Sequence, residues 1–324
     1  MWHLLNEELY LFAPFHPREI MQSLETIVVR PMSHNGLRFL TLLVILSIHG
    51  PHLTAAPAAE KINTAPVKYA RFRVGEMVAY GIVEGDSIRQ LQGDLFGSRQ
   101  LTDKAYPLSS VELLVPVEPK QVLAMAVNYK SHAPGAILPE IHNIPQPFFK
   151  GLNCLIADKQ KIVIPQDATE VHFEAELVIV IGKEAHNVPQ DKALDYVFGV
   201  TCGNDVSERV WQKADKQWWR AKGTNTFGPV GPYIVSGLDY DNLLVTLRLN
   251  GEVKQQERSS ELVHGVRATV SFISKYVKLQ PGDLIFTGTP GKTAAMKPGD
   301  TVEVEVEGVG TLTNQVVAAA RGTN

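Results

Sequence analysis

The sequence predicts an α+β fold that is rich in β-strands, because most of the chain after Val67 carries strand and turn signals. Leu177 to Ile181 is a continuous apolar run, which is typical of a strand covered on both faces. Val302 to Glu307 alternates apolar and acidic residues, which indicates a strand with one buried and one solvated face. Apolar residues at helical spacing occur between Val270 and Val277, so a few helices are expected beside the strands.

The composition of the 324 residues is that of an ordinary globular protein. Hydrophobic residues make up 44% and charged residues 20%, which excludes collagen, wholesale disorder and a protein with many membrane spans. The 31 basic and 34 acidic residues give a net charge of −3, so no nucleic-acid partner is expected. The two cysteines, Cys154 and Cys202, allow at most one disulfide and exclude a thiolate metal cage.

Residues 1–63 are predicted to be a leader that is not part of the fold. Phe39 to Ile48 is a short apolar run, preceded by a basic residue and followed by small residues between Ala55 and Ala59. These are the parts of a secretory signal peptide with Met32 as a natural start, and the run is too short to span a bilayer. If the segment 33–59 is used as a signal, the protein is exported to the periplasm or secreted. If the segment is only a disordered tail, the protein is cytoplasmic.

Residues 64–118 are expected to form a small β-rich domain, and residues 119–324 the main domain. Tyr80 to Leu91 in the first part has the pattern of a hairpin with Glu84-Gly85-Asp86 at its turn. The boundary is placed at the proline-containing stretch Val115 to Pro119, where the strand signals pause.

A stronger hairpin and a helix are predicted in the main domain. Leu243 to Gln256 alternates around Asn250-Gly251, and both residues tolerate the positive φ that a two-residue turn needs. Pro-Gly-Asp turns beginning at Pro281 and Pro298 bracket further strands. Helical spacing also occurs from about Val206 to Trp218.

Two glutamates stand at the beginning of the buried apolar strand. Glu174 and Glu176 are two residues apart, so they point to the same side of an extended chain. Two ionised carboxylates side by side repel each other and are costly to bury. A divalent cation resolves both problems, whereas a solvated strand end with two acidic residues is the ordinary alternative.

A second polar cluster follows at Gly203 to Ser207, which is expected to be a turn that leads into the helix. On that helix Asp205, Arg209 and Gln212 would share one face. Asp205 is a candidate third oxygen ligand, Arg209 can hold a carboxylate by a bidentate pair, and Gln212 can donate to a substrate oxygen. The ordinary alternative is a capping aspartate in a surface ion pair, worth about 0.3–0.5 kcal/mol. Three carboxylates without histidine or cysteine ligands favour a hard cation, Mg²⁺ or Mn²⁺.

Three further segments carry candidate polar groups. Lys222 can neutralise developing oxyanion charge if it lies near the site, although most lone lysines are surface residues. The loop Thr287 to Gly291 offers hydroxyls and backbone N–H groups to a carboxylate. Its end resembles a phosphate-binding loop, but Phe286 stands where that motif needs glycine, so nucleotide binding is rejected. His132 follows the apolar strand Val122 to Val127, and a neutral imidazole at a strand exit can act as a general base.

Taken in order, these segments resemble the fumarylacetoacetate hydrolase family from about Val67 to Gln315. The motifs that carry the resemblance are Asn128-Tyr129 with His132, Glu174-x-Glu176, Asn204-Asp205 with Ser207, Arg209 and Gln212, Lys222 with Phe227 to Pro232, and Thr287 to Gly291. Each motif is weak alone, but the ordered set is specific. The resemblance implies a C-terminal mixed β-roll after a small N-terminal β domain, usually in a homodimer. It also implies that Glu174, Glu176 and Asp205 hold Mg²⁺ or Mn²⁺.

The resemblance further implies chemistry on a small 2-oxo acid or β-diketo acid, which would chelate the cation through two oxygens. The cation would stabilise the enolate that is left when a C–C bond breaks. Lys222 and Gln212 would add positive potential at the same oxygens, and His132 would deprotonate the attacking water. The residues implied to bind the substrate are Arg209, Tyr129 and Thr289.

Three positions depart from the family pattern. Gly135 stands where similar hydrolases carry a glutamate that orients the histidine, although Glu140 can return to it. Gly223 and Asn225 replace a serine and an aspartate near the lysine.

The first hypothesis is a metal-dependent hydrolase that cleaves C–C bonds in acylpyruvate-like or β-diketo acids. The second is a decarboxylase or enol–keto isomerase of 2-oxo dicarboxylic acids, which needs no water-activating pair, and the third is a non-catalytic exported binding protein.

Overall fold

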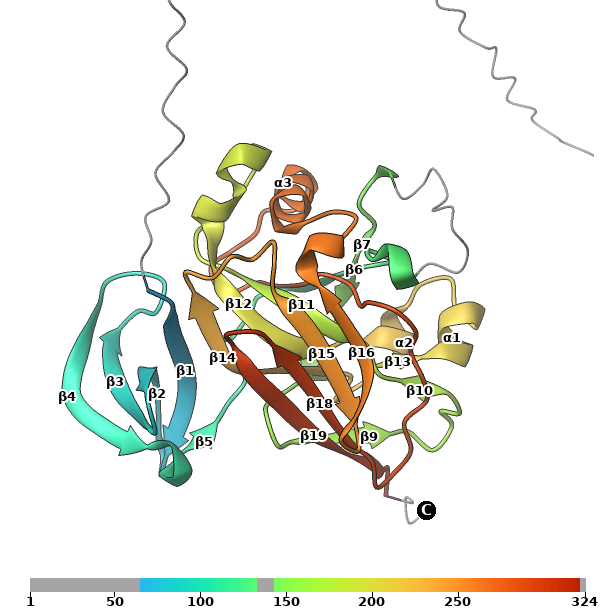
Figure 1. The fold of residues 1–324 in the computed structure, drawn as a ribbon, viewed down its shortest axis with the longest axis horizontal. Helices are drawn as coiled ribbons and strands as arrows, with labels where there is room; N and C mark the ends of the chain where they lie inside the picture. Colours follow the sequence, from blue (N-terminus) through green and yellow to red (C-terminus); the bar gives the residue numbers. More distant parts are fainter. Residues whose placement is uncertain (1–64, 133–142, 321–324) are drawn as a thin grey trace, which may run out of the picture. The chain divides into compact units, whose positions relative to one another are not determined.

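The computed structural model describes residues 65–132 and 143–320, which belong to one compact unit. The proposed leader, residues 1–63, lies outside the described residues, as do Gly135 and Glu140. The described part is rich in strands and contains few helices, which confirms the predicted α+β class (Figure 1).

The secondary structure of the described residues is as follows. The strands are β1 (Val67–Val74), β2 (Met77–Glu84), β3 (Ser87–Gly93), β4 (Arg99–Pro107), β5 (Glu112–Leu113), β6 (Val122–Met125), β7 (Pro147–Lys150), β8 (Leu155–Ile156), β9 (Lys161–Ile164), β10 (Val171–His172), β11 (Ala175–Ile181), β12 (Val197–Asn204), β13 (Ser207–Glu208), β14 (Gly228–Ser236), β15 (Leu244–Leu249), β16 (Glu252–Arg258), β17 (Leu284–Phe286), β18 (Thr301–Val306) and β19 (Gly310–Ala318). The α-helices are α1 (Arg209–Ala214), α2 (Trp219–Gly223) and α3 (Val266–Tyr276).

The described strands form two large mixed sheets and one small one. The largest has the order β4-β3-β2-β1-β14-β12-β11-β17-β6-β7, with β5 beside β1 and β8 beside β14. A five-stranded sheet has the order β16-β15-β18-β19-β9, and β10 pairs with β13. Most neighbours are antiparallel, but β17 with β6, β19 with β9 and β14 with β8 are parallel. The two large sheets contact each other through β14 with β19, β12 with β18, and β11 with β15.

Strand β11 is buried on both faces, as its apolar run predicts. Leu177 and Ile179 pack into the core that lies between the two large sheets, together with Val304 of β18. Val178 and Val180 point the other way, into a second core. Burying one such side chain contributes about 1.5–3 kcal/mol, so β11 is a rigid base for residues at its beginning.

Both predicted hairpins are confirmed. Strands β2 and β3 pair around Gly85, and β15 and β16 pair around Asn250-Gly251. Asn250 has φ 53° and Gly251 has φ 82°, the left-handed conformation that a two-residue hairpin turn requires. The helical spacing near Val270 is also confirmed, by helix α3.

The N-terminal strands have a small core of their own, formed by Ala70, Phe72 and Ile88. Strand β1 also pairs with β14, so the largest sheet runs from these strands into the rest of the unit. A division into domains at residues 118 and 119 stays a prediction.

The helix predicted from Val206 to Trp218 is wrong in its extent. Ser207 and Glu208 form β13 against β10, and the helix begins only at Arg209. The reason is local, since the Glu208 carboxylate accepts the N–H of Trp211 at 2.5 Å and so caps α1 at its first turn. Asp205 therefore does not lie on a helix with Arg209 and Gln212.

Both cysteines, Cys154 and Cys202, are buried free thiols. Burial raises the pKa of Cys202 to about 12, so its thiol stays protonated at neutral pH. None of the helices within residues 65–132 and 143–320 is long and apolar enough to cross a membrane.

Candidate active site

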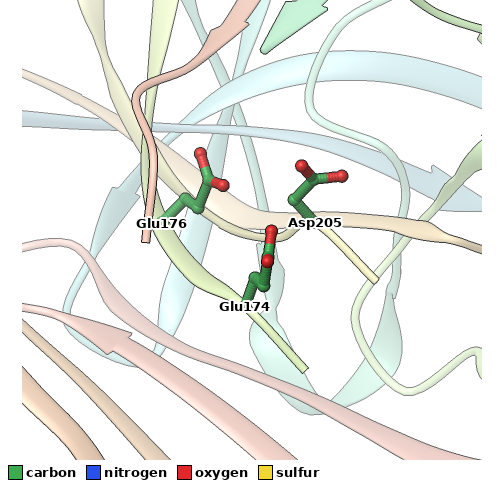
Figure 2. A group of neighbouring side chains, drawn as sticks. All are labelled: Glu174, Glu176 and Asp205. Carbon is green, nitrogen blue, oxygen red and sulfur yellow. The ribbon is translucent and has the colours of Figure 1, made fainter. Parts of the chain in front are cut away.

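Three carboxylates at the adjoining ends of two neighbouring strands gather in one place (Figure 2). Glu174 immediately precedes β11, Glu176 is its second residue, and Asp205 immediately follows β12. The antiparallel register brings them together, because Glu176 pairs with Gly203 and the Asp205 N–H bonds the Glu174 carbonyl at 2.9 Å. One donor oxygen from each of the three residues lies within 4.8 Å of the others, and all three residues are buried.

Three cationic side chains match the three carboxylates in number, but their ion pairs are with Glu174 and Asp205. Lys222 Nζ lies 2.5 Å from Glu174 Oε2 and 2.7 Å from Asp205 Oδ2. Arg209 Nη2 donates to Glu174 Oε1 at 2.6 Å, and Lys150 Nζ donates to Asp205 Oδ1 at 2.6 Å. Arg209 therefore pairs with Glu174, not with Asp205 as an i,i+4 helical pair would require.

Lys150 also contacts the carboxylate cluster, and sequence reasoning missed it. It ends the short strand β7, and its side chain is completely buried. Besides Asp205, its ammonium donates to the carbonyl oxygens of Lys222 and Phe227. The available signal was a lysine directly after Phe148-Phe149, which is weak because many strand ends carry lysine.

The two glutamates experience opposite electrostatic environments. Burial alone would raise the pKa of Glu174, but Lys222 and Arg209 outweigh burial and lower it to about 2. Burial and the neighbouring carboxylates of Asp205 and Glu174 raise the pKa of Glu176 well above its ordinary value. Glu176 accepts the N–H of Gly288 at 2.6 Å, which offsets this only in part. The positive charge near Glu176 is too small to offset its burial and its acidic neighbours. Such a carboxylate is suited to bind a divalent cation.

His132 is held in one tautomer by its surroundings. It lies in a short 3-10 helix, Lys130–His132, and its Nδ1 is 2.7 Å from the carbonyl oxygen of Gly291. Because a carbonyl oxygen can only accept, Nδ1 must carry the proton of the neutral imidazole. In this neutral tautomer Nε2 carries the lone pair, and it lies 3.8 Å from Glu174 Oε1.

The structure brings most of the sequence-predicted residues around one small cavity of about 30 Å³. The proposed residues that line it are His132, Glu174, Glu176, Gln212, Lys222 and Thr289. Asp205 and Arg209 are joined to this lining by their contacts with Lys222 and Glu174. Tyr129 is fully buried but is not among the described residues that line the cavity, and its hydroxyl has no hydrogen-bond partner among them.

A buried amide on strand β16 also belongs to the site and was missed from the sequence. Gln255 Nε2 donates to Thr289 Oγ1 at 2.9 Å and to the carbonyl oxygen of Pro290 at 2.5 Å. The sequence shows Gln255 only as a polar residue in a hairpin strand, beside an identical neighbour, Gln256. Nothing local distinguishes the glutamine that faces the site from the one that does not.

Two family models match the chain. Residues 121–317 match the model described as fumarylacetoacetate (FAA) hydrolase C-terminal, and residues 67–116 match the one described as Rv2993c-like, N-terminal. Protein Rv2993c of Mycobacterium tuberculosis is 39% identical over 265 residues, which cover 78% of this chain and 98% of that protein. A mitochondrial oxaloacetate tautomerase of Xenopus laevis is 35% identical over 222 residues, covering 64% of this chain and 69% of that protein.

Solved structures agree with these matches. The 2-hydroxyhepta-2,4-diene-1,7-dioate isomerase of Mycobacterium marinum has a TM-score of 0.73 and 38% identity, covering 79% of this chain and 100% of that chain. The maleylpyruvate hydrolase of Sphingobium sp. SYK-6, in complex with manganese (II) and pyruvate, has a TM-score of 0.65 and 27% identity, covering 78% of this chain and 100% of that chain. The chain therefore belongs to the fumarylacetoacetate hydrolase family, whose members include hydrolases, isomerases and tautomerases.

Proposed function

We propose that the protein is a divalent-metal enzyme that interconverts the enol and keto forms of a small 2-oxo acid. The observation that carries the proposal is the buried cluster of Glu174, Glu176 and Asp205, whose donor oxygens lie within 4.8 Å of one another. Mg²⁺ or Mn²⁺ suits this set, because hard cations prefer carboxylate oxygens. When bound, the cation would act as a Lewis acid on the substrate carbonyl.

The names of the relatives favour isomerisation over hydrolysis, which the sequence alone placed first. The oxaloacetate tautomerase and the heptadiene-dioate isomerase are 35% and 38% identical to this chain, whereas the maleylpyruvate hydrolase is 27% identical. All three names refer to small organic acids. An enol–keto conversion of such an acid is the reaction that the higher identities support.

The charges around the cluster support an anionic substrate. Lys150, Lys222 and Arg209 balance the three carboxylates. A bound divalent cation would therefore leave the site with a net positive charge, which attracts a substrate that carries one or two carboxylates. The hydroxyl of Thr289, which lines the cavity, is proposed to bind one of them.

His132 is the residue proposed to move the proton. Its unprotonated Nε2 would take a proton from the carbon next to the substrate carbonyl and return it to the carbonyl oxygen, which converts the keto form to the enol form. Lys222 and Gln212 line the same cavity and would stabilise the negative charge that develops on that oxygen. The Gly291 carbonyl would stabilise the imidazolium that forms, because it accepts the hydrogen bond from Nδ1–H before and after the proton transfer.

Hydrolysis of a C–C bond is the second candidate function. The observation that favours it is the same free lone pair on His132 Nε2, since it can instead remove a proton from a water molecule. The two functions differ in the atom from which His132 takes its proton, so the products distinguish them.

Metal dependence of the reaction is the first expected result. Adding Mg²⁺ or Mn²⁺ to chelator-treated protein should accelerate the enol–keto conversion of oxaloacetate at least about 10-fold, because the cation stabilises the developing charge. The conversion is measured by the ultraviolet absorbance of the enol, with CO₂ release and the cleavage products of an acylpyruvate measured in parallel. Two products from the acylpyruvate without enol–keto conversion would favour hydrolysis, and no metal-dependent turnover of either acid would refute the proposed function.

Loss of the imidazole tests the role of His132. His132→Ala should lower kcat for the enol–keto conversion about 100-fold or more, because general-base catalysis contributes at least this factor. The control is His186→Ala, since His186 is exposed and contacts Asn187 rather than the cavity. Equal kcat values for the two variants would show that another group moves the proton.

A further inference from the structure

Strand β16 carries two polar side chains, Gln255 and Glu257, on the face that elsewhere packs into the core. Gln255 pairs with Leu247 and Glu257 pairs with Val245, so the four side chains lie on one face of the five-stranded sheet. Leu247 and Val245 are core residues. Gln255 is buried and bonds the loop Thr287–Gly291, whereas Glu257 is half-buried and bonds the exposed Ser131 beside that loop.

Gln255 ties the loop to the strand that carries the glutamates. Its amide nitrogen donates to Thr289 Oγ1 at 2.9 Å and to the Pro290 carbonyl oxygen at 2.5 Å. Its amide oxygen accepts the N–H of Ala175 at 3.0 Å, and Ala175 stands between Glu174 and Glu176. A buried amide with both ends bonded holds its partners in a single arrangement.

Glu257 reaches His132 through two intermediate groups. Its carboxylate accepts the hydroxyl of Ser131, and the same Ser131 oxygen accepts the N–H of Gly291 at 2.9 Å. The carbonyl oxygen of Gly291 then accepts Nδ1–H of His132 at 2.7 Å. Each hydrogen bond in this relay has an unambiguous donor and acceptor, so the relay fixes the direction of the imidazole ring.

We infer that Gln255 and Glu257 are positioning residues of this active site, Gln255 acting through Thr289 and Glu257 acting through Ser131 and Gly291 on His132. The inference rests on the proposed function. Glu257 would thus provide a carboxylate that orients His132, in place of the glutamate for which this chain has Gly135. This carboxylate comes from β16 of the five-stranded sheet and acts on His132 indirectly.

The two residues should affect different kinetic constants. Gln255→Met removes the hydrogen bond that holds the Thr289 hydroxyl, which is proposed to bind the substrate carboxylate. KM for oxaloacetate should therefore rise about 10-fold, while kcat changes less than about 3-fold.

Glu257→Leu interrupts the relay to His132, so kcat should fall about 10- to 100-fold with little change in KM. Glu257→Gln should keep most of kcat, because its amide oxygen still accepts the Ser131 hydroxyl. Ser131→Ala and the double variant Ser131→Ala/Glu257→Leu should lower kcat as much as Glu257→Leu does, because each of these variants interrupts the same relay.

The same strand offers matched controls. Gln256 points to the opposite face and bonds Thr246, and Glu252 forms an exposed ion pair with Lys254. Gln256→Met and Glu252→Leu should leave both constants within about 2-fold of the wild type. If Gln255→Met behaves like Gln256→Met, or Glu257→Leu like Glu252→Leu, the inference is overturned for that residue.

Two measurements without substrate separate this inference from the proposed function. The ¹⁵N shifts of the His132 imidazole should report a protonated Nδ1 in the wild type and in Glu257→Gln, and a mixture of tautomers in Glu257→Leu. Calorimetry should show weaker Mn²⁺ binding in Gln255→Met than in Gln256→Met. Shifts and affinities that do not differ would refute the positioning roles, whereas the expected differences without turnover of any 2-oxo acid would refute only the proposed function.

Discussion

Replacing Glu176 with glutamine is expected to weaken metal binding at least about 100-fold and to abolish metal-dependent turnover, because a carboxylate ligand is lost. The metal-free variant should nevertheless be at least as stable as the wild type. Burial, together with repulsion from Asp205 and Glu174, raises the pKa of Glu176 well above its ordinary value. The glutamine oxygen can still accept the N–H of Gly288, so the substitution removes an acidic group that is costly to ionise there without removing a hydrogen bond.

The matched comparison is Glu174→Gln, which removes a carboxylate that has cationic partners. Lys222 and Arg209 each lose an ionised acceptor, so the free energy of unfolding of the metal-free protein should fall by about 1.5–3 kcal/mol. Urea unfolding in chelator gives the stabilities, and calorimetry with Mn²⁺ gives the affinities. Wild-type Mn²⁺ affinity in Glu176→Gln would remove this residue from the proposed ligand set.

Replacing Lys150 with methionine should lower the free energy of unfolding by about 3–5 kcal/mol, which is the usual effect of removing one partner from a buried ion pair. The ammonium is fully buried, and Asp205 raises its pKa despite the opposing effect of burial. Methionine fills similar space but leaves Asp205 Oδ1 and the carbonyl oxygens of Lys222 and Phe227 without their shared donor.

Lys254→Met is the control, because Lys254 pairs with Glu252 at the surface. This exposed pair should contribute at most about 1 kcal/mol. Both variants are compared by urea unfolding at neutral pH, and Mn²⁺ binding should also weaken in Lys150→Met because Asp205 loses its orientation. A loss of stability equal to that of Lys254→Met would mean that the buried charge of Lys150 is dispensable.

Local patterns in the sequence predicted most of the strands. The apolar run Leu177 to Ile181 predicted a doubly covered strand, and β11 has that position between two cores. Asn250-Gly251 predicted a tight turn, and both residues adopt positive φ. These features are set by neighbouring residues, so they can be read without knowledge of the rest of the fold.

Long-range pairing was the part that local patterns did not predict. Ser207 and Glu208 have no strand signal, yet they form β13 because β10 lies beside them. Lys150 is 55 residues from Asp205, and only the folded sheet brings the two together. The convergence of the carboxylates was expected from the resemblance to a family, since spacing alone does not give the register of β11 against β12.

That register has a consequence for how the chain can vary over evolutionary time. Ala175 lies opposite Asn204 in the ladder, and the alternation of sides along β11 continues without a break as far as Val180. One residue gained or lost between Glu176 and Val180 would reverse the side to which both glutamates point, and they would then face a hydrophobic core. Homologues that retain turnover should therefore differ in length at surface turns, and hardly ever within this short stretch.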